Sequence, residues 1–518
     1  MRNTIVALLS MVFTVVFFHA VVALSTVSVE YREDAMDYEA DTQRYLRSSI
    51  SVTTDYAKVY ATLIKTNNGK TTATWAFSNT GEYAAIVAGY YFIHNASGLL
   101  LGKPAVYNPD PYSFPVRSGE TGISLCKSGN PDYAMHGIVV SLYDRLNKPQ
   151  IRLRIGASLQ ERFMRSDDVE EKLYPYSISG LLSHDSKDGL YSEPVNIITY
   201  FANVTLQPFE YVVVQGCYYH TGLYHENTKI LFDKDSVDAT ALQSFGGYSL
   251  YGRYQDKILT VFTEWAIAQK EVKGNSSSPS QYNNAYLYGI TVKKKGIQLR
   301  SIIQKTERYF YAPFSSSFGG NAPRDIYYYS AQIKPIRWML LSWAYIDQNY
   351  LVPSTYYAEY PHKRLHCIRT TFTIQSLQIQ TDYRLMTLYK EGAEQQDSRY
   401  QTGLDWMVTK NVSLNMKYGL YTGDDSAWYI RSGYGVQWGS LQHAMSVVYV
   451  NSNGKKVYCA MLPLANSNIL TEACSSTAAY VAVRLSYRSR LCQLSVRLLS
   501  ELSHIKNGKG EFGATAWF

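Results

Sequence analysis

The chain has 518 residues, which is too long for a mini-protein. Of these, 46% are hydrophobic and 18% charged, a balance that excludes a disordered chain. Its formal net charge of +8 is mild for the length, and the basic residues are not clustered, which argues against a nucleic-acid-binding protein. After the N-terminus no apolar run reaches the roughly 18 residues that a membrane-spanning helix needs, so a helical multi-span membrane protein is excluded.

The first 24 residues are predicted to be a cleaved signal peptide. Arg2 gives a short charged start, an apolar run follows from Thr4 to Phe18, and small residues stand at Ala20 and Ala23. The alternative is an uncleaved membrane anchor, because the apolar stretch counts to about 19 residues, near the lower limit for spanning. Export is therefore expected, and residues 25–518 are expected to form the mature protein.

Much of the mature chain alternates between apolar and polar residues with a period of two, which is typical of β-strands. The pattern is clearest between residues 400 and 500, where, for example, Trp428, Ile430 and Val436 alternate with Arg431 and Gly433. Several runs reach the roughly 9 to 11 residues that a tilted strand needs to cross a bilayer. A soluble β-sandwich would alternate in the same way, but the strand lengths favour a membrane barrel.

Short polar breaks alternate with long ones along the chain, as expected for a barrel with short periplasmic turns and long extracellular loops. The long polar stretches are residues 102–135, 165–194, 233–247, 270–285 and 312–325. The N-terminal third alternates less cleanly, so residues 95–135 are a candidate for an in-folded loop or small plug. With about 25 to 30 residues for each strand and its connection, we expect an all-β fold: a single transmembrane antiparallel barrel of roughly 16 to 20 strands.

The C-terminal segment Gly510–Phe518 places Phe512, Ala514, Ala516 and Phe518 on one face and ends on an aromatic residue. This segment resembles the terminal strand of porin-like bacterial outer-membrane β-barrel proteins, without indicating a subfamily. The resemblance covers the last nine residues and, less specifically, the architecture of the mature chain. It implies a place in the outer membrane after export to the periplasm, with Phe512 and Phe518 as the signal that the barrel-assembly machinery recognises.

Basic residues on the polar faces of the predicted strands would point into the lumen of a barrel. They are Arg152, Arg154, Lys417, Arg431, Arg484, Arg488 and Arg497. Rings of Arg and Lys in a pore favour anions, so we expect a mild preference for anionic or polar solutes. The alternative is that these charges pair with Asp405, Glu501 and others and only fill the interior.

Tyrosine and tryptophan are predicted to mark the two membrane interfaces. The chain contains 47 tyrosines, whose rings suit a boundary between apolar and aqueous surroundings. Tyr418, Trp428 and Trp438 stand near strand ends and are the predicted members of the interface girdles. The alternative role is cross-strand packing in a soluble sheet.

No motif of catalytic or cofactor chemistry is found. The sequence contains no P-loop, G-x-S-x-G elbow or H-E-x-x-H, so no enzyme activity, cofactor or metal is predicted. His362, His366 and Cys367 are the best metal candidates, but exposed loop imidazoles are the preferred interpretation because the sequence supplies no convergence of ligands. Among the six cysteines there is no C-x-x-C pair, and Cys459 with Cys474 could tie the ends of a loop.

The leading hypothesis is an outer-membrane channel for passive diffusion of small polar or anionic solutes. The expected partners are outer-membrane lipid, the barrel-assembly machinery and small polar solutes; no nucleic acid is expected, and a homo-oligomer is compatible with the sequence. The alternative is a surface-exposed barrel that acts as an adhesin or binding protein through its long loops. A third hypothesis is a secreted soluble β-rich protein, for which Asn95, Asn203, Asn275 and Asn411 would be glycosylation acceptors.

Overall fold

The structure, a computed structural model, describes most of the chain between residues 26 and 517. The ranges inside these limits that it does not describe are 36–43, 54–56, 67–70, 82, 102–110, 114–121, 127–133, 145–149, 166–181, 184–190, 225–240, 274–280, 316–322, 352–360, 391–392, 424–425, 454–456, 461–470, 475–476, 490–491 and 502–508. The predicted signal peptide, residues 1–24, and Phe518 also lie outside the described residues.

The described secondary structure is almost entirely β-strand, with one short 3-10 helix, η2 (Pro111–Ser113). The first strands are β1 (Thr26–Ala35), β2 (Arg44–Thr53), β3 (Ala57–Thr66), β4 (Thr71–Thr80), β5 (Ala84–His94), β6 (Gly122–Leu125), β7 (Met135–Asp144), β8 (Gln150–Arg165), β9 (Leu182–Ser183), β10 (Tyr191–Phe209), β11 (Val212–Tyr224), β12 (Ala241–Gln255), β13 (Leu259–Lys273) and β14 (Gln281–Lys294). They are followed by β15 (Ile297–Thr306), β16 (Arg324–Ile336), β17 (Met339–Tyr350), β18 (His362–Ile374), β19 (Leu377–Lys390), β20 (Ala393–Thr409), β21 (Val412–Thr422), β22 (Ala427–Trp438), β23 (Leu441–Asn451), β24 (Val457–Ala460), β25 (Thr471–Cys474), β26 (Ala478–Arg488), β27 (Cys492–Glu501) and β28 (Lys509–Trp517). Among the described residues, no helix has the length and apolar character to cross a membrane.

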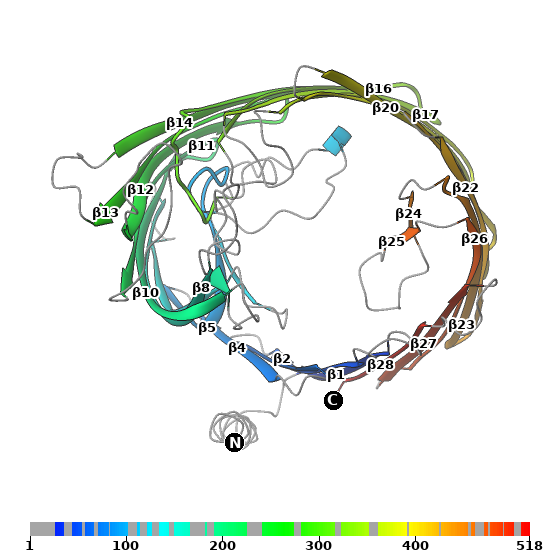
Figure 1. Ribbon diagram of the computed structural model, residues 1–518, viewed down its shortest axis with the longest axis horizontal. Coiled ribbons are helices and arrows are strands. Elements are labelled where there is room, and N and C mark those ends of the chain that lie inside the picture. The colour runs from blue at the N-terminus through cyan, green and yellow to red at the C-terminus, as the bar shows by residue number, and fades with distance from the viewer. Residues whose placement is uncertain are drawn as a thin grey trace.

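The strands form one antiparallel sheet that closes on itself. Consecutive strands pair along the chain, and β28 pairs both with β27 and with β1, so the ring visible in Figure 1 has no free edge. The sheet holds 26 described strands. Two of them pair on one side only, β6 with β5 and β9 with β8, so they are not part of the closed ring of pairings. This leaves 24 described strands in the ring. Closure removes the unpaired backbone groups that an open sheet would expose to lipid.

The expected number of 16 to 20 strands is therefore too low. The estimate assigned about 25 to 30 residues to each strand with its connection, whereas at one rim the strands are joined by turns of only two to five residues, such as 410–411 and 439–440. At the other rim the connections reach 26 residues in 452–477 and 40 in 95–134. The predicted alternation of short and long connections holds along most of the chain, but residues 391–392 and 423–426 are short connections at the second rim. However, strands β6 and β9 lie within stretches that the sequence predicts as polar loops, and strands β10, β12, β14 and β16 begin inside such stretches.

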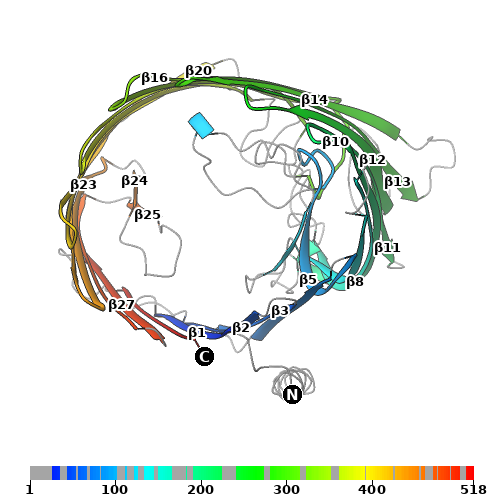
Figure 2. The same cartoon turned by 180° about the vertical axis from the view of Figure 1, so that it is seen from behind.

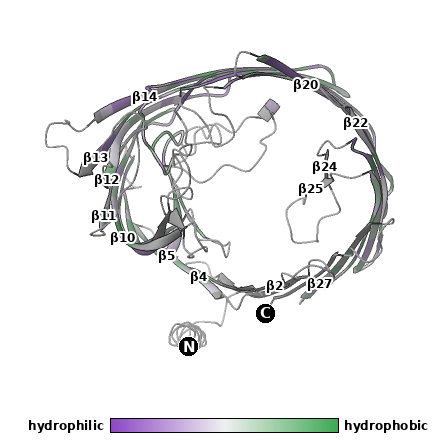
Figure 3. Cartoon of the chain, in the orientation of Figure 1, coloured by the Kyte–Doolittle hydropathy of each residue, from purple (hydrophilic) through white to green (hydrophobic). Residues whose placement is uncertain are grey.

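The wall of the barrel has an apolar outer face. On β8, Ile151, Ile155 and Leu159 are 44%, 54% and 62% exposed, while Arg154 and Ser158 between them are buried on the inner face. Figure 3 shows apolar and polar residues recurring along the same strands, as a period of two requires. Exposed apolar side chains on this scale are unfavourable in water, so the outer face suits the hydrocarbon of a bilayer.

Two segments from the rim with longer connections fold into the ring. Asn95–Leu101 follows β5, and Phe310–Ser315 follows β15, and both contribute buried side chains to one apolar cluster with the inner wall. Figures 1 and 2 show that η2 and the small sheet of β24 and β25 also lie within the ring. In that small sheet Val457 pairs with Cys474 and Cys459 with Glu472, so the backbone brings the segments of the two cysteines together, and a disulfide between them stays a hypothesis.

Candidate functional site on the inner wall

The candidate site is a group of basic side chains on the inner faces of β18 to β26. Successive side chains of a strand point to opposite faces. Ile368, Ile430 and Leu485 are 54%, 43% and 46% exposed on the outer face, so the basic residues next to them point inward. We call this group the basic face. Its members are Arg369, Arg384, Arg399, Lys417, Arg431 and Arg484.

Like charges stand directly opposite one another on the basic face. In the antiparallel register Arg384 is opposite Arg399, and Lys417 is opposite Arg431. Opposed like charges destabilise a pair of strands, whereas opposite charges stabilise it by about 0.2 to 1 kcal/mol. Strand pairing alone therefore does not favour these residues, and their joint positive potential is a property to explain.

Carboxylates balance only part of this charge. Among the described side chains on the inner faces of β18 to β22, the cations are Lys363, Arg369, Arg384, Arg399, Lys417 and Arg431 and the anions are Asp382, Asp397 and Asp405. Asp382 is almost completely buried and binds two cations, Arg369 at 2.7 Å and Arg384 at 2.8 Å. Asp405, which the sequence offers as a partner for the lumen charges, lies opposite Gln378 and Asn415.

Two of the guanidinium groups lie over aromatic rings in cation–π contacts. The guanidinium of Arg399 lies 5.0 Å from the ring centre of Tyr421, and that of Arg369 lies 4.3 Å from the ring centre of Tyr112 in η2. Tyr328 and Gln332 on β16 donate hydrogen bonds to the carbonyl oxygens of Pro111 and Tyr112, at 3.0 and 3.3 Å. The short helix η2 thus lies at the edge of the basic face.

The seven cations predicted for the lumen do not form one ring. Lys417, Arg431, Arg484, Arg488 and Arg497 lie on β21, β22, β26 and β27, whereas Arg152 and Arg154 lie on β8, halfway around the barrel in the order of pairing. Arg152 stacks over Tyr143 at 5.0 Å, and Arg154 is 5% exposed and donates a 3.5 Å hydrogen bond to Asn203. A role of the seven residues in a pore stays a prediction.

Sequence reasoning missed Arg369, Arg384 and Arg399. All three follow the same period of two as the predicted cations, since Arg384 stands between Tyr383 and Leu385 in a run that ends at Tyr389. The signal was therefore present in β18, β19 and β20. It was harder to see because Asp382 and Asp397 interrupt the basic pattern on the same faces.

The predicted girdle residues lie on the outer face. Trp428 and Trp438 stand at the two ends of β22, and Trp438 is 63% exposed near the rim with short turns. Tyr418 on β21 lies opposite Ile430. Phe512, half of the predicted assembly signal, lies in β28 opposite Val496, while Phe518 is not described. Their contact with lipid or assembly machinery stays a prediction.

Histidines 362 and 366 lie on strand β18 and not in a loop as expected. Both are on the outer face, opposite Asn349 and Tyr345, while Cys367 is fully buried on the inner face. The three side chains therefore do not converge, and the described residues contain no group of three His, Cys, Asp or Glu suited to a metal ion.

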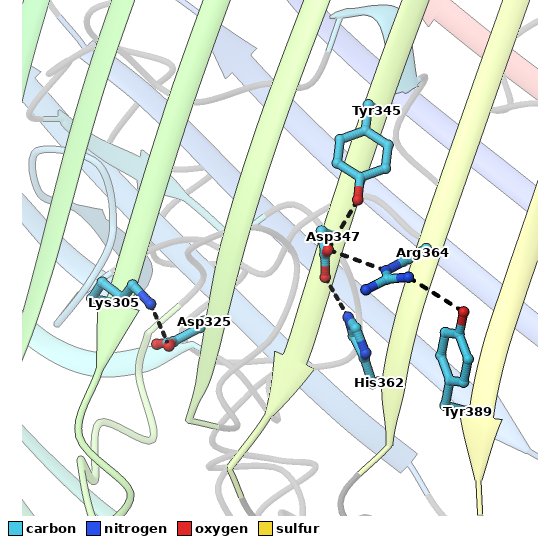
Figure 4. Close-up of polar contacts among 7 residues, drawn as sticks. All are labelled: Lys305, Asp325, Tyr345, Asp347, His362, Arg364 and Tyr389. Atoms are coloured by element: carbon cyan, nitrogen blue, oxygen red, sulfur yellow. Dashed lines mark hydrogen bonds and ion pairs between the residues drawn. The ribbon is translucent and has the colours of Figure 1, made fainter.

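An outer polar cluster surrounds His362 near the rim with longer connections. Figure 4 shows Asp347 accepting hydrogen bonds from Tyr345 at 3.0 Å and Arg364 at 3.4 Å and contacting His362 at 2.6 Å. Arg364 also donates to the hydroxyl of Tyr389 at 3.3 Å, and the pair Lys305 and Asp325 lies nearby at 2.8 Å. Polar groups here are consistent with the edge of an apolar band.

Comparison with solved structures identifies the architecture. No family model and no curated protein sequence matches the chain. Among the solved structures, the ferric enterobactin receptor PfeA of Pseudomonas aeruginosa, in complex with BCV-L6, is 11% identical with a TM-score of 0.50 over 96% of this chain and 82% of that one. The chain has the fold of a bacterial outer-membrane β-barrel protein.

Two further solved structures are similar to the chain at lower scores. The siderophore receptor PirA from Pseudomonas aeruginosa is 8% identical with a TM-score of 0.49, over 96% of this barrel chain and 80% of PirA. The translocation pore of the P pilus usher PapC is 9% identical with a TM-score of 0.44, over 95% of this barrel chain and 98% of the usher. At such identities the likeness concerns the fold alone.

Proposed function

We propose that the protein is an outer-membrane channel through which small polar solutes, and anions in particular, diffuse passively. The observation that carries this proposal is the set of opposed like charges on the basic face, Arg384 with Arg399 and Lys417 with Arg431. Because such pairs weaken the sheet, the attraction of anions accounts for them better than packing does.

The proposed location is the outer membrane of a bacterium, reached after export to the periplasm. The apolar outer face and the closed sheet support a place in a bilayer. The rim with longer connections is the proposed extracellular side, because barrels of this kind have their short turns in the periplasm. Barrel-assembly machinery, outer-membrane lipid and small polar solutes are the proposed partners.

Single-channel recording in a planar bilayer under a potassium chloride gradient tests the anion preference. The wild-type reversal potential is expected to have the sign of a chloride-selective pore. The double variant Lys417→Gln with Arg431→Gln should move it towards zero, whereas Arg152→Gln, on the opposite side of the ring, should move it less. A wild-type reversal potential with the sign of a cation-selective pore contradicts the proposal.

Uptake of a bound ligand is a second candidate function. The observation that favours it is the amount of chain inside the ring, where residues 95–101, η2 and 310–315 pack against the inner wall. Liposome swelling with sugars of graded size separates the two candidates. Swelling that falls smoothly with sugar size supports passive diffusion, whereas no swelling with any sugar, from protein that is folded by heat-modifiable mobility, supports ligand uptake.

A further inference from the structure

The in-folded segment Asn95–Leu101 is fastened to the wall by side chains of three strands. The Asn95 side chain donates to Ser249 on β12 at 3.1 Å and accepts from Asn203 on β10 at 2.8 Å. Ser97 donates to the carboxylate of Glu264 on β13 through both its backbone N–H, at 2.9 Å, and its hydroxyl. Each wall residue faces inward and is 6% exposed or less.

The backbone of the segment is shaped for this contact. Ala96 and Gly98 have φ values of 49° and 89°, and Gly98 donates to the carbonyl of Asn95 at 2.9 Å. The N–H of Asn95 donates in turn to the carbonyl of Leu101 at 3.2 Å, which closes the segment into a compact turn. A non-glycine residue in the left-handed region costs conformational energy, so the contact with Glu264 helps to maintain it.

Glu264 is unusual because it is a fully buried carboxylate, 0% exposed, in the middle of a barrel wall. A buried carboxylate is strongly disfavoured unless hydrogen-bond donors replace its water. Here Ser97, from the in-folded segment itself, supplies such donors. If the segment leaves the wall, water in the lumen can donate hydrogen bonds to the Glu264 carboxylate instead. The buried charge therefore does not prevent the segment from leaving. Leu99, Leu100 and Leu101, each 1% exposed or less, hold the segment by apolar packing.

We propose that residues 95–101 form a removable internal gate, latched to the wall by Glu264, Asn203 and Ser249. This inference rests on the proposed channel function, because it assigns regulation to the same interior. Cys217 lies on β11 between Asn203 and Ser249 in the register, and both of those residues bond Asn95. The seated gate therefore spans Cys217, which is 6% exposed, and an unseated gate uncovers it.

The test is the alkylation rate of Cys217 in the full-length protein in liposomes, measured by mass spectrometry of its peptide after timed exposure to iodoacetamide. Glu264→Ala should raise the rate at least about tenfold, since it removes the charge-assisted hydrogen bonds with Ser97 that exist only in the seated state. Glu210→Gln, in the exposed turn between β10 and β11, is the matched control and should leave the rate unchanged. The partly exposed Cys492 serves as the internal reference for reagent access.

A second variant covers the case in which Glu264→Ala fails to fold. Asn95→Ala combined with Ser97→Ala weakens the latch from the gate side and leaves the wall intact, and it should raise the Cys217 rate in the same direction. An unchanged Cys217 rate in a folded latch variant overturns the gate.

Conductance of the same variants separates the gate from the channel. Faster Cys217 alkylation with higher single-channel conductance supports both. Faster alkylation with no conductance in any variant leaves the gate standing and overturns the channel. Unchanged alkylation with normal wild-type conductance overturns the gate and leaves the channel standing.

Discussion

Arg384 on β19 lies directly opposite Arg399 on β20, so two guanidinium groups meet on one patch of the inner wall. One of them, Arg384, is held by Asp382 at 2.8 Å, and the other stacks on Tyr421 at 5.0 Å. This division of partners explains how the pair is tolerated while its positive charge is kept on the inner face.

Arg399→Glu is expected to separate stability from selectivity. The variant places opposite charges across the strand pair, which gains about 0.2 to 1 kcal/mol, but loses the stacking on Tyr421, which costs a similar amount. The free energy of unfolding should stay within about 1 kcal/mol of wild type, while the anion preference in single-channel recording falls. Arg399→Gln, which removes charge without reversing it, should shift the reversal potential less. An unchanged reversal potential in both variants would remove Arg399 from the solute path.

Ile155→Arg tests the outer face of the barrel. Ile155 is 54% exposed on β8, and an arginine near the middle of a lipid-facing strand costs about 2 to 4 kcal/mol. Ile297→Arg is the matched control, because Ile297 begins β15 beside the rim with short turns, where the same change costs about 0 to 1 kcal/mol. Urea unfolding from lipid vesicles measures both variants. Equal losses would contradict the assignment of Ile155 to the lipid-facing band.

Gly289→Ala is expected to disturb the packing of the inner wall. A Cβ at Gly289 would lie 2.0 Å from Cζ of Phe262, whose ring is buried and covers this position. The expected loss is about 1 to 3 kcal/mol, the usual cost of overpacking. At Gly252 a Cβ would meet only the Thr263 methyl at 3.9 Å. Gly252→Ala should therefore be neutral or stabilising by less than about 1 kcal/mol. Thermal unfolding in detergent measures both variants.

Asp256, in the turn between β12 and β13, is expected to make stability depend on acid pH. Its carboxylate accepts hydrogen bonds from the backbone N–H groups of Leu259 at 2.6 Å and Ile258 at 2.7 Å and from Tyr254 at 2.9 Å. These bonds, that from Leu259 first, hold the pKa of Asp256 below its ordinary value. The stabilisation is thus complete above the unfolded pKa of about 3.9 and is lost as pH falls through the lower folded pKa.

Asp256→Asn should flatten that acid limb. Thermal unfolding in detergent between about pH 5 and pH 2 measures the effect. Plots of melting temperature against pH should differ in slope between wild type and variant below about pH 4 and should run parallel above it. Identical slopes in the acid range would mean that the turn carboxylate does not contribute.

The faces of the strands could be predicted from the sequence, but the size of the ring could not. Alternation in Trp428 to Trp438 assigns Ile430 outward and Arg431 inward, and the structure places them so. The number of strands depends on how much chain each connection takes and on the pairing of β1 with β28, whose residues are separated by almost the whole sequence. Local periodicity contains no record of such a pairing.

The contents of the ring were harder to predict than its wall. Phe310, Tyr311 and Phe314 stand in and beside a stretch that the sequence pattern assigns to a polar loop, yet they pack against Tyr219 and Phe245 inside the barrel. Three aromatic residues within five positions were the available signal. Glu264 gave none, because a single carboxylate on a strand looks the same whether it faces water or a buried turn.

Trp428 and Trp438 lie ten positions apart on the outer face of β22. Ten residues of strand span about 33 Å, or about 25 Å along the normal of the membrane at a tilt near 40°. The prediction that these two indole rings mark the membrane interfaces therefore implies an apolar band of about this thickness. The barrel should consequently insert faster into vesicles of short-chain lipids than into thick, sterol-rich membranes, whose hydrocarbon core would be thicker than its apolar band.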